Sequence, residues 1–169
     1  MPNWVKTKIW FDGENEGTEK FINDCLNDEG NFDFEKIIPM PDYIYRGPLG
    51  LDEEKKYGRN NWYDWSIDNW GTKWNAESTF VNAEQGYVEF ETAWSVAFPV
   101  LQKMAENYIG TIGNRIIVEY ADEDIGSNCA SIIFEASDDG FFTYDIVYPD
   151  DPDRFALDVW EYEDEDLEW

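Results

Sequence analysis

Six short segments in which apolar and polar residues alternate place the strongest limit on the fold of this 169-residue chain. Side chains of a β-strand point to opposite faces in turn, so a half-buried strand shows a two-residue period. In the first segment, Val5, Ile9 and Phe11 fall on one face, and Lys6 and Lys8 fall on the other. The same pattern predicts strands over residues 4–11, 78–83, 87–92, 115–120, 130–136 and 141–148.

Two longer segments have the apolar spacing of amphipathic helices. One covers residues 18–27, with Thr18 as its N-terminal cap, and the other covers residues 97–109. A third, short helix is expected to end at Gly71, since glycine accepts the left-handed conformation that often closes a helix. Residues 31–75 are rich in Pro, Gly and Trp, and we interpret them as an insertion that is irregular over its first part, residues 31–58.

Without the insertion, the order strand, helix, strand, strand, helix, strand is the split βαβ order of ferredoxin-like folds. We therefore expect an α+β sandwich: an antiparallel sheet with two main helices, extra C-terminal strands and the insertion. The predicted domain spans residues 1–162, with a last strand or helix around Leu157, and residues 163–169 form an acidic C-terminal tail. The predicted core contains Val5, Ile9, Phe21, Leu101, Ile116, Ile132 and Phe134.

Negative charge is concentrated in the last third of the chain. The formal net charge is -26, and residues 119–169 contain 18 Asp and Glu against one base, Arg154. Charge of one sign disfavours binding to nucleic acid and anionic membranes, and favours a basic protein surface. An apolar content of 43%, with 18% aromatic residues, supplies the buried area that a folded domain needs despite this repulsion.

The residue types exclude most catalytic sites. The absence of histidine removes His-based triads, Cys-His dyads and His metal sites. Cys25 and Cys129 are too few for a Cys-rich zinc site and are expected to be reduced core thiols. Asp122, Asp124 and Gly126 lack the spacing of a calcium-binding loop, so a solvated turn is the simpler interpretation. We expect no enzyme activity, no cofactor and no metal.

The start of the chain does not have the pattern of a signal peptide, because Lys6 and Lys8 interrupt any apolar run. The apolar stretches elsewhere fall short of the roughly 20 residues that a membrane span requires. These features predict a cytoplasmic protein, as a monomer or a homodimer.

Two aromatic segments resemble a known family. The opening Met1-Pro2-Asn3-Trp4 and the run Asn61-Trp62-Tyr63-Asp64-Trp65 through Asn69-Trp70-Gly71-Thr72-Lys73-Trp74 resemble the YubB-type ferredoxin-like proteins of phages and plasmids. The order of strands and helices extends the resemblance to residue 148, and the acidic tail has no counterpart in it. The resemblance implies a ferredoxin-like fold and a mobile-element origin, and it supplies no catalytic residues.

The Trp-rich run has two interpretations. Trp62, Trp65, Trp70 and Trp74 either pack as part of the core or line a pocket for a ligand or a partner. Aromatic platforms for nucleic acid also need a positive groove, and few bases flank this run.

The acidic surface also has two interpretations. It either maintains solubility alone, or it acts as a phosphate-like DNA mimic that binds the nucleic-acid-binding groove of a basic host protein. The second favours an inhibitor of the anti-CRISPR or anti-restriction type; the alternative is a non-catalytic ligand-binding or structural module with a Trp-lined pocket. The candidate partner-binding residues, expected to be exposed, are Glu119, Asp122, Glu123, Asp124, Glu135, Asp138, Asp139, Asp145, Asp158, Glu161 and Glu163.

Overall fold

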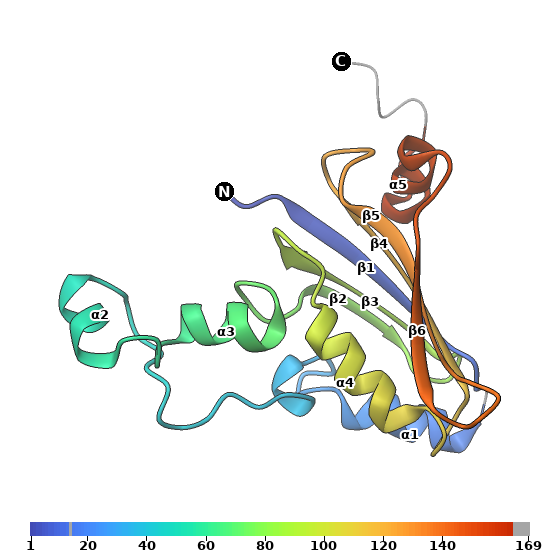
Figure 1. Ribbon diagram of the computed structural model, residues 1–169, viewed down its shortest axis with the longest axis horizontal. Coiled ribbons are helices and arrows are strands. Elements are labelled where there is room, and N and C mark those ends of the chain that lie inside the picture. The colour runs from blue at the N-terminus through green and yellow to red at the C-terminus, as the bar shows by residue number, and fades with distance from the viewer. Residues whose placement is uncertain (14, 164–169) are drawn as a thin grey trace.

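A six-stranded antiparallel sheet forms the centre of the protein (Figure 1) in a computed structural model that describes residues 1–13 and 15–163. The order β2-β3-β1-β4 is the ferredoxin-like order, and β5 and β6 extend the sheet beyond β4. The predicted α+β fold is confirmed, and every strand end lies within two residues of its predicted position. Across the sheet the strands are β2 (Glu77–Asn82), β3 (Tyr87–Ala93), β1 (Trp4–Phe11), β4 (Arg115–Asp122), β5 (Cys129–Ala136) and β6 (Phe142–Val147).

The two main helices, α1 (Glu16–Asp24) and α4 (Phe98–Tyr108), pack on one face of the sheet, which we call the covered face. The predicted cap of α1 is wrong, because the Asn15 side chain accepts the hydrogen bond from the backbone N–H of Thr18 at 2.9 Å. The helix therefore begins earlier, and Thr18 is a buried helical residue. Its hydroxyl oxygen lies 2.9 Å from the phenolic oxygen of Tyr108, which ties α1 to α4.

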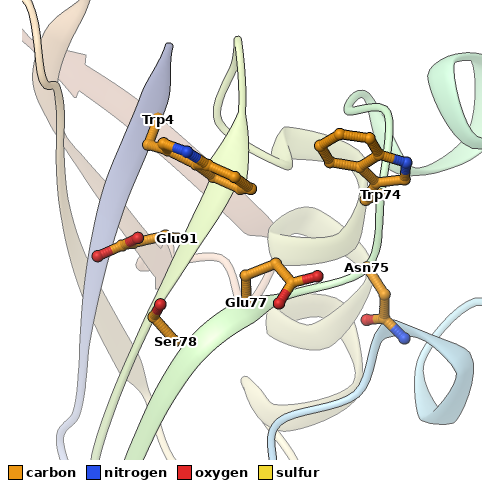
Figure 2. Close-up of a pocket in the computed structure, with 6 residues that line it drawn as sticks. All are labelled: Trp4, Trp74, Asn75, Glu77, Ser78 and Glu91. Atoms are coloured by element: carbon orange, nitrogen blue, oxygen red, sulfur yellow. The ribbon is translucent and has the colours of Figure 1, made fainter. Parts of the chain in front are cut away.

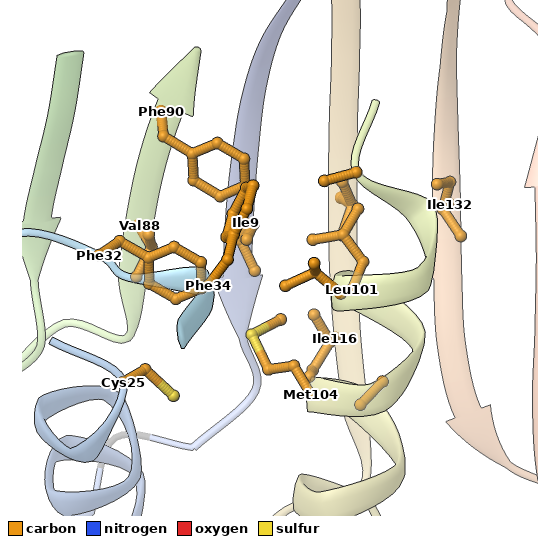
Figure 3. Packing of buried hydrophobic residues seen from close by; sticks show 14 of the residues in the cluster. Ile9, Cys25, Phe32, Phe34, Val88, Phe90, Leu101, Met104, Ile116 and Ile132 are labelled. Carbon is orange, nitrogen blue, oxygen red and sulfur yellow. The ribbon is translucent and has the colours of Figure 1, made fainter. Parts of the chain in front are cut away.

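Apolar side chains of the covered face form the main core (Figure 3), and six of the seven predicted core residues are buried there. Phe21 is the exception, since it is only partly buried while its neighbour Ile22 is fully buried. The Phe21 ring lies at the edge of the layer, 5.2 Å from the ring centroid of Tyr108 and 6.0 Å from that of Phe11.

The insertion is more ordered than the sequence predicts. It contains the short helix η1 (Phe34–Lys36), α2 (Leu51–Tyr57) and α3 (Trp62–Trp70). The rings of Phe32 and Phe34 join the core, and Phe32 stacks on Phe90 at 5.1 Å, so this part of the insertion is packed against the sheet. By contrast, α2 has no buried residue and projects away from the sheet (Figure 1).

A last helix, α5 (Pro152–Trp160), lies on the other face of the sheet, which we call the open face. Ala156 and Val159 of α5 pack against Ala121 and Cys129, so the helix covers one end of that face. The predicted acidic tail falls almost wholly on residues 164–169, outside the described residues. None of the helices in the described ranges has the length and apolar character that a membrane crossing requires.

Candidate functional site

The open face of the sheet is where the charged side chains of the central strands gather. The strand register places Lys8 of β1 between Glu89 of β3 and Glu119 of β4. Lys6 lies next along β1 and contacts the carboxylate of Glu89 at 3.6 Å. Lys8 itself is only 6% exposed, and its ammonium contacts Glu161 at 3.3 Å. Acidic groups therefore outnumber basic ones at the centre of this face.

Helix α5 forms one wall of the site, and a single indole fixes its position. The Trp160 Nε1–H lies 3.0 Å from the carbonyl oxygen of Ala121 and 3.1 Å from that of Asp122. The ammonium of Lys6 lies 5.4 Å from the centre of the same ring, within the range of a cation–π contact. Glu161 then ends the helix in the left-handed region, at φ 58°, and turns toward Lys8.

Five of the predicted partner-binding acids share this side of the molecule. Glu119, Glu135 and Asp145 project from the open face of β4, β5 and β6, as the strand register shows. Asp158 and Glu161 lie on α5 or at its end. Burial raises the pKa of Glu119, and Asp158 raises it further while Lys8 lowers it. These carboxylates stand on a rigid sheet and helix, so a partner meets charges already held in place.

The acids at the end of β4 and the start of the following loop have a structural role instead. Asp122 was expected to be exposed, and this is wrong: it is 6% exposed. Its carboxylate accepts hydrogen bonds from the amide of Asn3 at 3.3 Å and from the backbone N–H of Asp124 at 2.9 Å. Glu123 accepts one from the backbone N–H of Trp4 at 2.9 Å. These bonds hold the N-terminus against the loop.

The two remaining loop acids lie at the far end of the sheet. Asp138 and Asp139 are exposed on the turn between β5 and β6, at the opposite end of the sheet from Asp122. Glu163 is exposed a few residues after α5. The predicted acids therefore do not form one row, and the set on the open face is the one that the fold brings together.

The four Trp residues of the predicted pocket separate into two groups. Trp70 is buried against Phe34, and its Nε1–H lies 2.9 Å from the carbonyl oxygen of Ile38. Trp65 packs edge-on against Trp70, with ring centroids 5.2 Å apart. Trp62 donates to the carbonyl oxygen of Gly47 at 3.0 Å. These three hold the insertion together, and the fourth, Trp74, lines a cleft.

Two hollows lie on the open face over β1, β2 and β3. The larger, of about 690 Å³, is lined by Trp4, Trp74, Asn75, Glu77, Ser78 and Glu91 (Figure 2). The second, of about 440 Å³, is lined by Lys8, Trp10, Phe80, Tyr87, Glu89 and Glu161. Our sequence analysis missed Trp4, Trp10, Glu89 and Glu91 as site residues. A signal for the rings existed, because Trp4 and Trp10 fall on the polar face of the first predicted strand.

The thiols are poor candidates for chemistry. Cys25 and Cys129 are both free and buried, as expected. Burial raises the pKa of the Cys25 thiol to about 12, with a contribution from the charge of Asp24. Burial also raises the pKa of Cys129, and Asp153 adds to it. Because the thiolate is the reactive form, neither residue is an activated nucleophile at neutral pH. Within residues 1–13 and 15–163, no three Asp, Glu or Cys side chains come together as metal ligands.

Comparison with known proteins supports a ferredoxin-like family. Residues 69–151 match a family described as a ferredoxin-like domain in Api92-like protein. The matched segment begins near the end of α3, contains β2, β3, α4, β4, β5 and β6, and stops before α5. Neither a curated protein nor a solved structure matches this chain. The YubB-type resemblance and the mobile-element origin are finer than this match and stay predictions.

Proposed function

We propose that this protein binds and inhibits a basic nucleic-acid-binding defence protein of a host cell, as an inhibitor of the anti-CRISPR or anti-restriction type. The carboxylates of the open face and α5 take the place of nucleic-acid phosphates, and the protein works in the cytoplasm without catalysis of its own. The supporting observation is that Glu119, Asp145 and Asp158 stand on rigid elements on one side of the molecule. Prepositioned charges reduce the ordering cost of binding.

Direct binding of nucleic acid is a weaker candidate. Four-stranded sheets of RNA-binding domains stack bases on aromatic side chains, and this open face also exposes rings, with Phe80 at 55% and Trp10 at 37%. Here, however, Glu89 and Glu161 line the same hollow. A phosphate backbone would meet these carboxylates and be repelled, whereas a basic protein surface would be attracted.

Affinity capture tests the proposal with two double variants that change the net charge by the same amount at different places on the molecule. The immobilised protein is exposed to host lysate at low and high salt, with and without duplex DNA. We expect capture of a nucleic-acid-binding protein that high salt and DNA both prevent, since surface attraction is screened over about 8 Å at physiological ionic strength. Asp145→Lys with Asp158→Lys should abolish capture. The matched control, Asp52→Lys with Glu54→Lys on the projecting helix α2, changes the net charge equally and should retain it.

Two results would contradict the proposal. Equal loss of capture by both double variants would mean that net charge alone attracts the protein. A captured partner that still binds DNA normally when saturated with this protein would exclude inhibition by phosphate mimicry.

The second candidate function is a non-catalytic ligand-binding module in which the charge serves only solubility. The cleft lined by Trp4 and Trp74 favours it. Under this alternative, neither double variant would change what the protein binds.

A further inference from the structure

The cleft lined by Trp4 and Trp74 combines one wall of paired indoles with two carboxylates. The two indoles pack against each other, with ring centroids 6.0 Å apart and planes tilted by 32°, so a ligand would meet the outer side of this pair. Glu77 and Glu91 come from the facing positions of β2 and β3, and Figure 2 shows them beside the rings with Ser78. Aromatic faces and carboxylates are the two groups that attract an organic cation.

Local structure holds both indoles in place before any ligand arrives. Trp4 begins β1 opposite Ala93, whose small side chain leaves the space over β3 to the indole ring. Trp74 has the ammonium of Lys73 at 4.3 Å from its ring centre, and the same ammonium lies 5.0 Å from the Trp94 ring. The next residue, Asn75, accepts from the backbone N–H of Phe34 at 2.9 Å. The indole pair is therefore preorganised, which lowers the cost of binding.

The charge of the two carboxylates is only partly balanced by neighbouring bases. Glu77 and Glu91 are cross-strand partners, and like charges in that position repel each other. Lys6 lies opposite Glu91 in the register of β1 and β3, but its ammonium also contacts the carboxylate of Glu89 at 3.6 Å and lies 5.4 Å from the centre of the Trp160 ring. Burial raises the pKa of Glu91, and Lys6 and a hydrogen bond from Ser78 lower it only in part. An incoming cation would relieve both the repulsion and the burial of charge.

A local irregularity creates this arrangement. The pairing of β2 with β3 shifts between Glu77 and Phe80, and Ser78 within that bulge has φ 49°, in the left-handed region. Bulges turn side chains and are frequent next to binding sites. Here the bulge directs Glu77 and Ser78 toward the cleft.

We propose that this cleft binds the side chain of an arginine or lysine from a basic segment of a protein partner. Arginine fits best, because its planar guanidinium stacks on indole and also pairs with a carboxylate through two hydrogen bonds. A divalent cation is disfavoured, since Ca²⁺ takes six to eight oxygen ligands and the cleft offers two carboxylates. The net charge of -26 favours a basic partner, and the second hollow on the same face extends the surface that such a segment can cover.

Short peptides test the site on the full chain. We compare a Gly-Ser peptide with one central arginine, the same peptide with norleucine, and free spermidine, and follow the indole N–H resonances by NMR. The arginine peptide should shift the resonances of Trp4 and Trp74, and the norleucine peptide should not. Glu91→Gln, which is nearly isosteric, should weaken arginine binding about tenfold. Trp74→Leu should weaken it about tenfold as well, and the control Phe141→Leu, at an exposed ring on the turn between β5 and β6, should leave it unchanged.

Three outcomes would overturn the proposal. Equal binding of the norleucine peptide would make the cleft a purely apolar site. Tighter binding of spermidine than of the arginine peptide would point to a free amine in place of a partner side chain. No shift of either indole with the arginine peptide would exclude a cation site.

The inference rests on the proposed function for its partner, and the two can fail separately. Asp145→Lys with Asp158→Lys should keep arginine-peptide binding while it abolishes capture from lysate. Peptide binding without any capture would leave the cleft standing and reject the phosphate-mimic function. Capture that survives Trp74→Leu, together with absent peptide binding, would reject the cleft alone.

Discussion

The two faces of the sheet differ in composition and in role. On the covered face, Val5, Ile9, Val88, Ile116 and Ile132 are each at most 1% exposed. The residues that follow them along the strands point to the open face and are mostly charged, polar or half-exposed. A one-residue slip of any strand would exchange the two sets, so burial of the first face fixes the register of the second. Stability thus comes from one face and recognition chemistry from the other.

Each face contains a residue that departs from this division. On the covered face, the Thr7 hydroxyl is buried and has no hydrogen-bond partner among the described residues. On the open face, Lys8 is nearly buried but keeps an ion pair with Glu161. The lysine is tolerated because helix α5 brings a carboxylate to it. The unpartnered Thr7 hydroxyl is unfavourable in the core, so its removal should change the stability of the fold.

Neighbouring isoleucines on β5 provide the largest expected contrast. Ile132 points to the covered face and is 1% exposed, whereas Ile133 points to the open face and is partly exposed. Ile132→Ala should lower the free energy of unfolding by about 2–5 kcal/mol through lost burial and a cavity. Ile133→Ala should cost clearly less. Denaturant titration measures both, and equal losses would mean that the two faces do not differ as described.

Two threonines of the covered face sharpen the comparison. Thr7→Val removes an unpartnered hydroxyl and should raise the free energy of unfolding by about 1 kcal/mol. Thr92→Val is the control, because its hydroxyl donates to the carbonyl oxygen of Ser95 at 2.6 Å. That change should cost about 1–3 kcal/mol, since the carbonyl loses its partner. Thermal unfolding shows whether each change stabilises or destabilises the fold. Destabilisation by Thr7→Val would mean that the Thr7 hydroxyl contributes to stability, against the prediction.

Substitution of Glu91 should have a smaller effect on the free energy of unfolding, and this effect should depend on pH. Its pKa lies above the ordinary value of 4.5, mainly because of burial, so the folded state binds the proton more tightly than the unfolded state. Protonation of Glu91 therefore contributes to the free energy of unfolding below the ordinary pKa. This contribution is lost as the pH rises through the raised pKa of the folded state. Glu91→Gln should stabilise the fold at neutral pH, and the gain should vanish in acid.

The control for Glu91 is an exposed acid on the turn between β2 and β3. Because Glu84 is exposed, Glu84→Gln should change the free energy of unfolding by no more than about 0.5 kcal/mol. Unfolding midpoints measured from about pH 3 to pH 8 span the carboxyl titration range. If the stabilisation by Glu91→Gln increased as the pH falls, its pH dependence would be opposite to the one that burial predicts, and the prediction would be wrong.

The smallest effect on the fold should come from the open-face acids. Asp145 and Asp158 are exposed, so Asp145→Lys with Asp158→Lys should change the free energy of unfolding by no more than about 0.5 kcal/mol per site. The same variant is expected to abolish partner capture. Loss of folding by this variant would mean that the acids are structural, as Asp122 proved to be.

The predicted strands were confirmed because every second residue of a half-buried strand is apolar, and this period is visible in each segment alone. The closing Gly71 of α3 was confirmed for a similar local reason, with φ 76° at the helix end. The Thr18 cap failed because Asn15, three residues earlier, offers an equally good cap and the helix began there. Asp122 failed because its partner, Asn3, is distant in sequence and local charge gives no sign of it.

The sequence by itself determined the six strands, the two main helices, the ferredoxin-like order and the division of the sheet into an apolar and a polar face. These follow from short-range periodicity, which each segment contains. Only the tertiary structure decided that Trp4 meets Trp74, that α5 covers the open face, and that Glu77 faces Glu91. Those contacts join residues distant along the chain, and they depend on how packed layers and a strand bulge bring side chains together. The candidate site is therefore a product of packing, although every residue in it was visible from the start.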